Sequence, residues 1–441
     1  MKVALSIAGS DSIAGAGIQA DLKTFACFNV YGTTAITALT AQNTQGVLDV
    51  ITLPPEFVGK QIEAVVSDSG VDAAKTGMLG EGRIVKVVAR KIERYGIPLI
   101  VDPIVKAESG APLLKEDAFE VLLEELIPLS KIVTPNIAEA ERICGMEIKS
   151  VEDAEIAAKK IVRDFGCEAA VVKGGHLNAV DVLYFNGRIH KFGSERVEGC
   201  FHGTGCAFSA AITANIAKGV DVVSSVKIAK EFVNNAIRYA LNVGKGCSCL
   251  DHLSPLAINA ERWRMLVEFE KVLEDLKRLN PHNFIPEVGM NFAYALPKNY
   301  AKGREDVLAV EGRIVRGLRR IIVGTPKFGA SDHLARALLT FMEFYPEVRC
   351  AANIRYEEEL IEKARDLGFV VSNYDRREEP EEIKRKEGGT IPWGIKTALE
   401  KVGRRADIIY HTGDIGKEPM IVLFGENPKD LFEKISKLLK P

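Results

Sequence analysis

The first 250 residues alternate short β-branched runs with helical stretches, and this alternation constrains the fold more than any other feature. The pattern is typical of a mostly parallel sheet with helices on both faces, so we expect a doubly wound α/β domain. Nearly every candidate strand is followed by Gly, Asp, Pro or Asn, and ligands of open α/β sheets bind at the carboxyl ends of the strands. The candidate strands are residues 3–8, 73–76, 99–101, 132–134, 169–172 and 182–184.

A change of sequence character after Pro255 indicates a second domain. The chain has 441 residues, roughly three times the commonest domain size, so two domains are expected. Residues 261–279 place apolar side chains at helical spacing, and Asn280-Pro281 ends that segment. We predict domains at 1–255 and 256–441; the alternative gives this helix to the first domain. A separate α/β domain is predicted from strands at 321–323, 408–410 and 420–424 and from helices at 333–343 and 357–366.

The charge balance and the N-terminus argue against several classes of protein. The net charge is −2 and neither half is basic, which argues against a dedicated nucleic-acid binder. No apolar run approaches the roughly 20 residues that span a bilayer. The apolar N-terminus reaches Asp11 too early for a signal peptide. We therefore expect a cytoplasmic protein with no membrane or nucleic-acid partner.

The eight cysteines fit a reducing compartment. Most lie in apolar settings, where a free thiol behaves as a small hydrophobe, and Cys200 is expected simply to be packed. The pair Cys247 and Cys249 lacks the second ligand pair that a zinc site needs. Glutamine is rare amid abundant Glu and Lys, a bias that resembles the composition of thermophile proteins.

The sharpest motif is Gly203-Thr204-Gly205-Cys206, which is followed at once by a strong helix former. Glycines let backbone N–H groups turn inward, and the helix start adds its partial positive charge, so the motif predicts an anion hole. A cysteine at that helix start would have a lowered pKa and could act as a base or a polar contact. The alternative interpretation is a glycine-rich helix start with a buried cysteine.

Polar and glycine-rich segments follow the other candidate strands as well. Because each lies where a strand should end, all of them are expected to converge on one cleft. The segments are residues 9–11, 14–23, 37–43, 75–79, 101–103, 134–140 and 172–176.

These segments resemble, in order and spacing, the hydroxymethylpyrimidine and hydroxymethylpyrimidine-phosphate kinases of thiamin biosynthesis, members of the ribokinase-like superfamily. The resemblance covers about residues 1–250. It implies a ribokinase-like fold, ATP as co-substrate with Mg²⁺, and two phosphorylations that convert the aminopyrimidine alcohol into its diphosphate. It also implies a homodimer. The alternative among enzymes is a pyridoxal-type kinase.

The resemblance implies a pyrimidine-binding group of residues. Asp21 and Gln42 would hydrogen-bond the polar edge of the pyrimidine, and Gly9 and Met78 would line its face. Cys206 would contact the accepting hydroxyl and deprotonate it.

A second group would serve the nucleotide. Lys173 would neutralise ATP phosphates as a point charge, with Asp102 and Thr204 also on the ATP side. Asp102 and Glu139 would hold Mg²⁺ through water, because Mg²⁺ prefers oxygen ligands and keeps several waters. Gly203, Thr204 and Gly205 would stabilise the transferring phosphoryl group.

The chain departs from the family pattern at a few positions. Ala14 replaces the first glycine of the usual loop, and Glu108, two residues after Lys106, stands where the family commonly has Lys. The Asn-Thr that usually precedes His-Gly-Thr-Gly-Cys reads Cys200-Phe201, a change at a nucleotide-side contact. The histidines His176 and His202 are expected to support the structure rather than to act in catalysis.

The second half carries dense polar motifs of another kind. Ser331 or Asp332 is a credible N-cap, so the following helix start could hold an anion. Arg313, His333 and Arg336 would suit a diphosphate, since arginine offers a bidentate fork. The alternative interpretation is a helix cap with surface charges.

Residues from about 260 to 441 resemble the archaeal-type thiamin-phosphate synthase domain. The resemblance implies that hydroxymethylpyrimidine diphosphate is joined to thiazole phosphate, releasing pyrophosphate. Arg313 and His333 fall on positions expected to be essential, and Asn291, Ser331 and Asn353 are expected to bind substrate. His333 could protonate or hydrogen-bond the departing phosphate. The rival is a non-catalytic sensor of thiamin phosphates. The segments that carry the resemblance are 286–295, 312–315, 328–336, 353–356 and 411–420.

Overall fold

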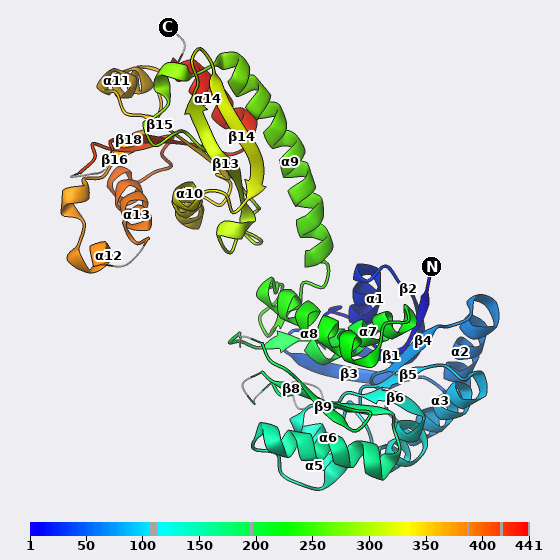
Figure 1. Cartoon of the computed structure of the whole chain (residues 1–441). Coiled ribbons are helices and arrows are strands. Elements are labelled where there is room, and N and C mark those ends of the chain that lie inside the picture. Colours follow the sequence, from blue (N-terminus) through cyan, green and yellow to red (C-terminus); the bar gives the residue numbers. More distant parts are fainter. Residues whose placement is uncertain are drawn as a thin grey trace. The chain divides into compact units, whose positions relative to one another are not determined.

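The computed structural model divides the chain into two compact units, Met1–Leu256 and Ala257–Pro441, here called unit 1 and unit 2 (Figure 1). The division falls beside Pro255, where the sequence changes character. The structure describes residues 1–105, 113–175, 177, 179–194, 197–385, 388–414 and 418–439. Lys106, Glu108 and His176 therefore lie outside the described residues.

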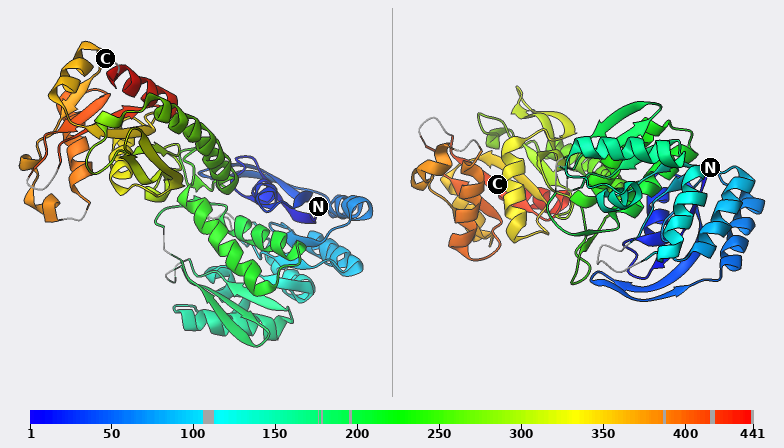
Figure 2. Two further views of the ribbon diagram at one scale, coloured as in Figure 1. Left: turned by 45° about the horizontal axis from the view of Figure 1, so that its top comes forward. Right: turned by 90° about the horizontal axis from the view of Figure 1, so that it is seen from below.

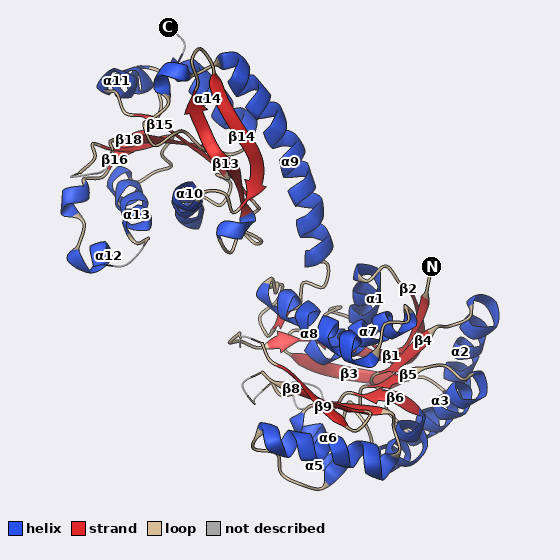
Figure 3. Cartoon of the chain, viewed as in Figure 1, coloured by secondary structure: helices blue, strands red, loops and turns tan. Residues whose placement is uncertain are grey.

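Unit 1 is built on a sheet with strand order β3-β2-β1-β4-β5-β6-β7-β8-β9 (Figure 3). The inner strands β2, β1, β4, β5, β6 and β7 run parallel to one another. Strand β3 at one edge, and β8 and β9 at the other, pair antiparallel with their neighbours. The predicted mostly parallel sheet is confirmed. The bounds are β1 (Val3–Asp11), β2 (Tyr31–Asn43), β3 (Gly46–Thr52), β4 (Ala73–Thr76), β5 (Leu99–Val101), β6 (Ser130–Val133), β7 (Ala169–Val172), β8 (Asp181–Phe185) and β9 (Arg188–Phe192).

Helices cover both faces of this sheet, and each face has its own apolar core (Figures 1 and 2). This is the doubly wound arrangement that the alternating pattern predicts. One face carries α2 (Pro55–Ser69), α3 (Gly82–Tyr95), α4 (Glu116–Val121), α5 (Ile137–Cys144) and α6 (Val151–Phe165). The other carries α1 (Gly17–Cys27), α7 (Thr204–Ala217) and α8 (Val222–Arg238).

Helix α7 lies against the middle of the sheet, where it contacts β1, β4 and β5. Its residues 206–217 are all buried. The polar ones bond back within the helix, as Thr213 Oγ1 donates to Ser209 O at 2.7 Å and Asn215 Nδ2 donates to Ala211 O at 2.9 Å. A helix that is apolar all round is a core element. The loop that precedes α7 is therefore attached to a rigid support.

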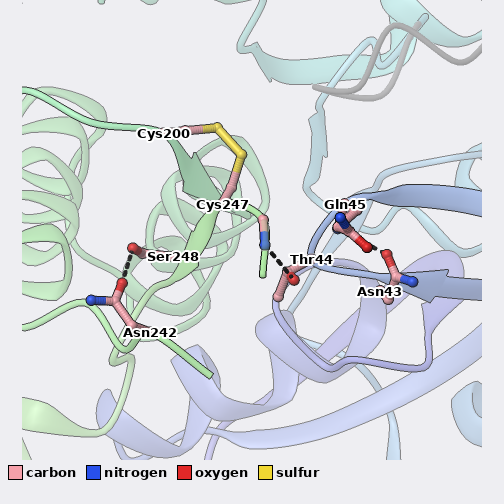
Figure 4. The surroundings of a disulfide bond; sticks show 8 residues. Asn43, Thr44, Gln45, Cys200, Asn242, Cys247 and Ser248 are labelled. Carbon is pink, nitrogen blue, oxygen red and sulfur yellow. Dashed lines mark hydrogen bonds between the residues drawn. A yellow bond between two sulfur atoms is a disulfide. The ribbon is translucent and has the colours of Figure 1, made fainter. Parts of the chain in front are cut away.

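A disulfide links two segments beside the start of α7 (Figure 4). The short strands β10 (Phe201–His202) and β11 (Ser248–Cys249) pair in parallel, with Phe201 opposite Ser248. The preceding residues are then adjacent, and Cys200 bonds to Cys247 with 4.9 Å between their Cα atoms. The expectation that Cys200 is a packed thiol is therefore wrong. The sequence did not reveal this disulfide, because it joins residues 47 positions apart that no local pattern relates. The other six cysteines, all within the described residues, are thiols.

Unit 2 has a second sheet, of order β14-β13-β12-β15-β18-β17-β16, in which β16 and β17 are parallel and the other pairs antiparallel. The predicted separate domain of helices and strands is confirmed. The strands are β12 (Phe292–Ala295), β13 (Val307–Arg316), β14 (Ile321–Phe328), β15 (Cys350–Arg355), β16 (Val371–Asn373), β17 (Ile408–His411) and β18 (Met420–Gly425). The helices are α9 (Ser254–Leu279), α10 (Asp332–Phe344), α11 (Glu358–Asp366), α12 (Glu381–Arg385), α13 (Thr390–Val402) and α14 (Pro428–Leu439).

The core of unit 2 forms between this sheet and its helices. Phe269 of α9 meets Phe292 of β12 edge-on at 5.5 Å between ring centroids, and Phe341 of α10 stacks on Phe424 of β18 at 4.1 Å. The helix predicted at 261–279 is confirmed, although it begins earlier, at Ser254. Among the helices in the described part of the chain, none is long and apolar enough to cross a membrane.

Candidate active site

The turn between β1 and α1 is organised by one carboxylate. Asp11 Oδ2 accepts hydrogen bonds from the backbone N–H groups of Gly15 (3.0 Å) and Ala16 (2.8 Å), and Oδ1 accepts one from Ile13 (3.1 Å). Burial disfavours charge on Asp11, but the hydrogen bonds from His202 and the backbone outweigh it and lower its pKa. The sequence analysis assigned Asp11 no role; the signal that it offers is an aspartate directly before a glycine-rich turn.

The predicted anion hole lies opposite this turn. Gly203 has φ of +91°, and a Cβ at this position would overlap the carbonyl oxygen of Gly15. Glycine is therefore required here both by conformation and by space. The next glycine faces two charged groups, since a Cβ on Gly205 would lie 3.3 Å from Lys173 Nζ and 3.5 Å from Asp102 Oδ2. The start of α7 thus combines helix polarity with an ammonium group, as an anion site needs.

Cys206 follows in the first turn of α7 and is buried. Burial raises the pKa of its thiol to about 12, and the attraction of Lys75 opposes this shift without overcoming it. The lowered pKa expected from the helix start is wrong, because loss of solvent outweighs the helix end here. Cys206 is therefore a neutral thiol near pH 7.

Beneath Cys206 lies a fully buried ion pair. Lys75 Nζ is 2.8 Å from Asp21 Oδ1, and Ser6 Oγ donates to Asp21 Oδ2 at 2.6 Å. Burial raises the pKa of Asp21. Burial lowers the pKa of Lys75, but the combined attraction of Asp21, Cys206 and Asp102 and the hydrogen bond to Asp21 outweigh it and raise that pKa. Direct recognition of the pyrimidine by Asp21 is a wrong prediction, because both carboxylate oxygens are bonded inside a core that solvent does not reach. Asp21 instead forms an ion pair with Lys75, a residue that had no predicted role.

The strand ends of β5, β6 and β7 bring together three further charged residues. Lys173 Nζ is 2.9 Å from Asp102 Oδ1. The other oxygen, Asp102 Oδ2, accepts from Ser209 Oγ at 3.4 Å. Glu139 caps the start of α5, where Oε2 accepts from the backbone N–H of Asn136 at 2.8 Å. Burial raises the pKa of Glu139 to about 7, with Lys173 opposing and Asp102 reinforcing the shift.

These carboxylates fit a magnesium ion that is held through water. Asp102 and Glu139 supply the oxygen donors that Mg²⁺ prefers. The repulsion between them, which adds to the effect of burial on the pKa of Glu139, is of the kind that a bound cation relieves. Within the residues described, no group of three or more potential metal ligands occurs.

The residues expected to bind the pyrimidine, other than Asp21, lie at the same end of the sheet. A Cβ on Gly9 would lie 3.2 Å from Met78 Sδ, which places the end of β1 against the segment after β4. Gln42, near the end of β2, has its side-chain amide 3.1 Å from His202 Nε2 and 3.2 Å from Thr40 Oγ1. The structure therefore brings Gly9, Gln42 and Met78 near the turn that Asp11 organises.

In unit 2 the two predicted asparagines join strands. Asn291 Nδ2 donates to Val310 O at 3.0 Å, and its Oδ1 accepts from Val310 N at 2.9 Å. Asn353 Oδ1 accepts from Asn291 N at 2.7 Å, and its Nδ2 donates to Gly289 O at 3.1 Å. Their amides thus fix β12, β13 and the loop before β12, a role that the sequence could not separate from substrate binding.

The charged residues of unit 2 lie on two elements. Arg313 sits at an irregularity of β13 with φ of +66°, an uncommon conformation for a non-glycine residue, and donates to Val288 O. Ser331 is confirmed as the N-cap of α10, since its hydroxyl accepts from Leu334 N at 3.4 Å. His333 is exposed in the first turn of α10, and Arg336 pairs with Asp332 at 2.8 Å.

An aromatic group formed by His411, Tyr374 and Trp393 lies at β16 and β17, and of its members only His411 belongs to a segment that carries the family resemblance. His411 packs against Tyr374 at 5.3 Å, and Tyr374 meets Trp393 edge-on at 5.9 Å. Burial lowers the pKa of His411 to about 4, so this histidine is neutral near pH 7.

Comparison with known proteins assigns both units to described families. Residues 11–251 match the family model of phosphomethylpyrimidine kinase, and residues 268–437 match that of the thiamine-phosphate synthase ThiN. Over 99% of its length the chain is 34% identical to a bifunctional thiamine biosynthesis protein ThiDN from Methanocaldococcus jannaschii, of which it covers 98%. It is 44% identical over 260 residues (57% of the chain, 94% of the relative) to a hydroxymethylpyrimidine/phosphomethylpyrimidine kinase of Bacillus subtilis.

The solved structures agree on the fold of unit 1. A Bacillus subtilis pyridoxal kinase, solved as an ADP complex, is 38% identical with a TM-score of 0.54 and covers 58% of this chain and 99% of its own. The ribokinase-like fold expected for unit 1 is thereby confirmed. Because both family models match in order and one relative matches end to end, the chain belongs to the family of bifunctional thiamine biosynthesis proteins that join a phosphomethylpyrimidine kinase to a ThiN-type thiamine-phosphate synthase.

Proposed function

We propose that unit 1 uses ATP to phosphorylate hydroxymethylpyrimidine and then its monophosphate, and that unit 2 joins the resulting diphosphate to thiazole phosphate. The chain is a bifunctional transferase of thiamin biosynthesis, as its end-to-end relative is named. The observation that carries the kinase assignment is the glycine loop at the start of α7, which faces Lys173 and Asp102.

In unit 1 the chain works mainly by positioning charge. The backbone at 203–205 and the ammonium of Lys173 face the site where phosphoryl oxygens gain charge in the transition state. Phosphoryl transfer passes through a loose transition state that asks for little proton removal, so a neutral thiol at Cys206 serves as a contact to the accepting oxygen. Cys206 does not act as the base that the family resemblance implies, because burial raises the pKa of its thiol to about 12.

We place the magnesium ion beside the glycine loop at residues 203–205. Asp102 and Glu139 would hold the ion through water, and it would neutralise charge on the phosphates. Lys75 and Asp21 support this arrangement from below, because their ion pair lies beneath Cys206 and contributes to its electrostatic surroundings.

In unit 2 a cationic clamp for the leaving pyrophosphate is the central requirement. We assign it to Arg313 and His333, with Ser331 presenting the start of α10. The carbonyl of Val288 and the irregularity of β13 hold Arg313 in place. We retain Asn291 and Asn353 as residues that shape the site through the strands that they join.

Each unit has an alternative function that is either supported by a specific observation or open to a specific test. The likeness to solved pyridoxal kinases favours pyridoxal as a second candidate substrate of unit 1. A sensor of thiamin phosphates is the alternative for unit 2. A homodimer, a cytoplasmic location and a heat-adapted source stay predictions.

The test is an ATP-dependent assay of the intact chain with hydroxymethylpyrimidine and thiazole phosphate. We expect thiamin phosphate from the parent chain, accumulated pyrimidine diphosphate from His333→Ala, and greatly reduced phosphorylation by Cys206→Ala. Turnover of pyridoxal but not of the pyrimidine would identify the alternative kinase. Binding of thiamin phosphate without synthesis would identify unit 2 as a sensor.

A further inference from the structure

His202 is the point at which three segments of unit 1 meet. It directly precedes the glycine loop, and its ring is largely buried in β10. Its Nε2 lies 2.9 Å from Asp11 Oδ2, which also binds the N–H groups of Gly15 and Ala16. The same nitrogen lies 3.1 Å from the side-chain amide of Gln42.

The hydrogen bonds around Gln42 determine how its amide must face. Asp11 is an ionised acceptor, since its pKa is lowered, so His202 Nε2 carries the proton and donates it to Asp11. The Thr40 hydroxyl donates to Ser10 O at 2.8 Å, which makes Thr40 Oγ1 an acceptor toward Gln42. The oxygen and nitrogen of an amide are assigned from such partners. The arrangement that leaves no two donors facing each other turns the carbonyl of Gln42 toward His202, where it shares the single Nε2–H with Asp11, and turns the NH₂ toward Thr40.

The ring of His202 also fixes the spacing between the two glycine loops. A Cβ on Gly15 would overlap the ring, and one on Gly203 would overlap Gly15 O, so the loops and the ring are in direct contact. Pairing of β10 with β11 and the disulfide at Cys200 hold the segment from its other side. A change at His202 therefore acts on Gln42 and on the phosphoryl loop together.

We infer that His202 is a positioning residue, which orients the Gln42 amide toward the pyrimidine and sets its distance from the phosphoryl loop at 203–205. The inference rests on the proposed kinase function of unit 1. In this arrangement the Gln42 amide keeps one N–H and one carbonyl lone pair for the pyrimidine, a donor and an acceptor in fixed order.

The test is steady-state kinetics on the full chain for the parent, His202→Ala and His202→Gln, with His190→Ala as the control. His190 lies on β9, the edge strand at the far end of the sheet from β2, so its loss removes an imidazole without reaching the site. We expect His202→Ala to raise the KM for hydroxymethylpyrimidine about tenfold, since one orienting hydrogen bond is lost, and to lower kcat about tenfold, since the alcohol is misplaced. The KM for ATP should change less than twofold.

His202→Gln should recover most of both losses, because a glutamine amide can place a donor near Asp11 Oδ2. An unchanged KM for the pyrimidine in His202→Ala would overturn the inference. Equal rises in both KM values, or no recovery with glutamine, would also overturn it, because a merely structural role predicts them. A parent chain that phosphorylates no pyrimidine would instead refute the proposed function.

Discussion

Removing the ammonium of Lys75 should destabilise unit 1 in a strongly pH-dependent way. The variant is Lys75→Met, which nearly preserves the length of the side chain and leaves Asp21 buried with Ser6 as its remaining polar partner. At 2.8 Å and an effective dielectric of about 20, the pair attraction that is lost is about 6 kcal/mol. Asp21 limits the loss by taking up a proton.

The proton uptake sets both the size and the sign of the effect. Protonating a carboxyl with an ordinary pKa of about 3.9 costs about 4 kcal/mol at pH 7 and about 1.5 kcal/mol at pH 5. The folded variant binds this proton and the unfolded chain does not. Its stability therefore falls by about 1.4 kcal/mol per pH unit as pH rises from about 4 toward the pKa of Asp21 in the variant. That pKa lies above the already raised pKa of Asp21 in the parent, because the attraction of Lys75 is gone. The predicted loss in the free energy of unfolding at pH 7, about 4 kcal/mol, agrees with the roughly 3–5 kcal/mol typical of a buried ion pair that loses one partner.

The assay is urea unfolding at pH 5, 6 and 7, followed by two probes. Both tryptophans, Trp263 and Trp393, lie in unit 2, so their fluorescence reports that unit and serves as an internal control. Circular dichroism adds the transition of unit 1. The double variant Asp21→Asn with Lys75→Met should lose the pH slope. A Lys75→Met slope equal to that of the parent, or a loss below about 1 kcal/mol at pH 7, would refute the reasoning.

Three further predictions concern the loop, the magnesium site and the disulfide. Gly203→Ala should lower kcat for phosphorylation at least a hundredfold, because its Cβ overlaps the facing loop, whereas Gly219→Ala, with φ of +84° and open space, should leave kcat within threefold; equal losses would contradict the steric argument. Glu139, with a pKa of about 7, should release about half a proton when Mg²⁺ binds at pH 7, and Glu139→Gln should release none in titration calorimetry with buffers of different ionisation enthalpy; equal release by both would move the titration elsewhere. Cys200→Ser should lower the free energy of unfolding of unit 1 by about 4 kcal/mol, as expected when a disulfide closes a loop between residues 47 positions apart, and should not move the fluorescence transition of unit 2. A loss of less than about 1 kcal/mol in unit 1 would show that the disulfide does not constrain the unfolded chain.

The sequence predicted the inner strands of unit 1 well, because those strands are buried on both faces. The strands at 73–76, 99–101 and 169–172 have the bounds that the structure gives to β4, β5 and β7. Outer strands were harder. Strand β3, with Leu48 and Ile51 exposed, and β9 lack a continuous apolar run, and neither was predicted. The inner strand β2, which is only partly buried, was also missing from the predicted strands.

The site was predicted less evenly, since several roles depend on contacts between distant segments. The loop at 203–206 is visible in four letters, but the contact of Asp21 with Lys75 spans 54 positions. The disulfide partner of Cys200 is likewise remote, and the pKa of Cys206 depends on burial that a motif does not reveal. Local patterns identify residues that come together at strand ends, whereas depth and pairing decide what each of them does.

The neutral thiol of Cys206 has a consequence for the charge that an acceptor meets. Asp21 is balanced by Lys75, Asp102 is balanced by Lys173, and the thiol between them keeps its proton near pH 7. Counted as two ion pairs and a neutral thiol, these five groups carry no net charge, and Glu139, with a pKa of about 7, adds about half a negative charge near pH 7. A carboxylate in place of the thiol would repel a phosphate monoester but not an uncharged alcohol. The neutral thiol repels neither of them. One pocket is in this way electrostatically suited to an uncharged acceptor in a first phosphorylation and to an anionic acceptor in a second.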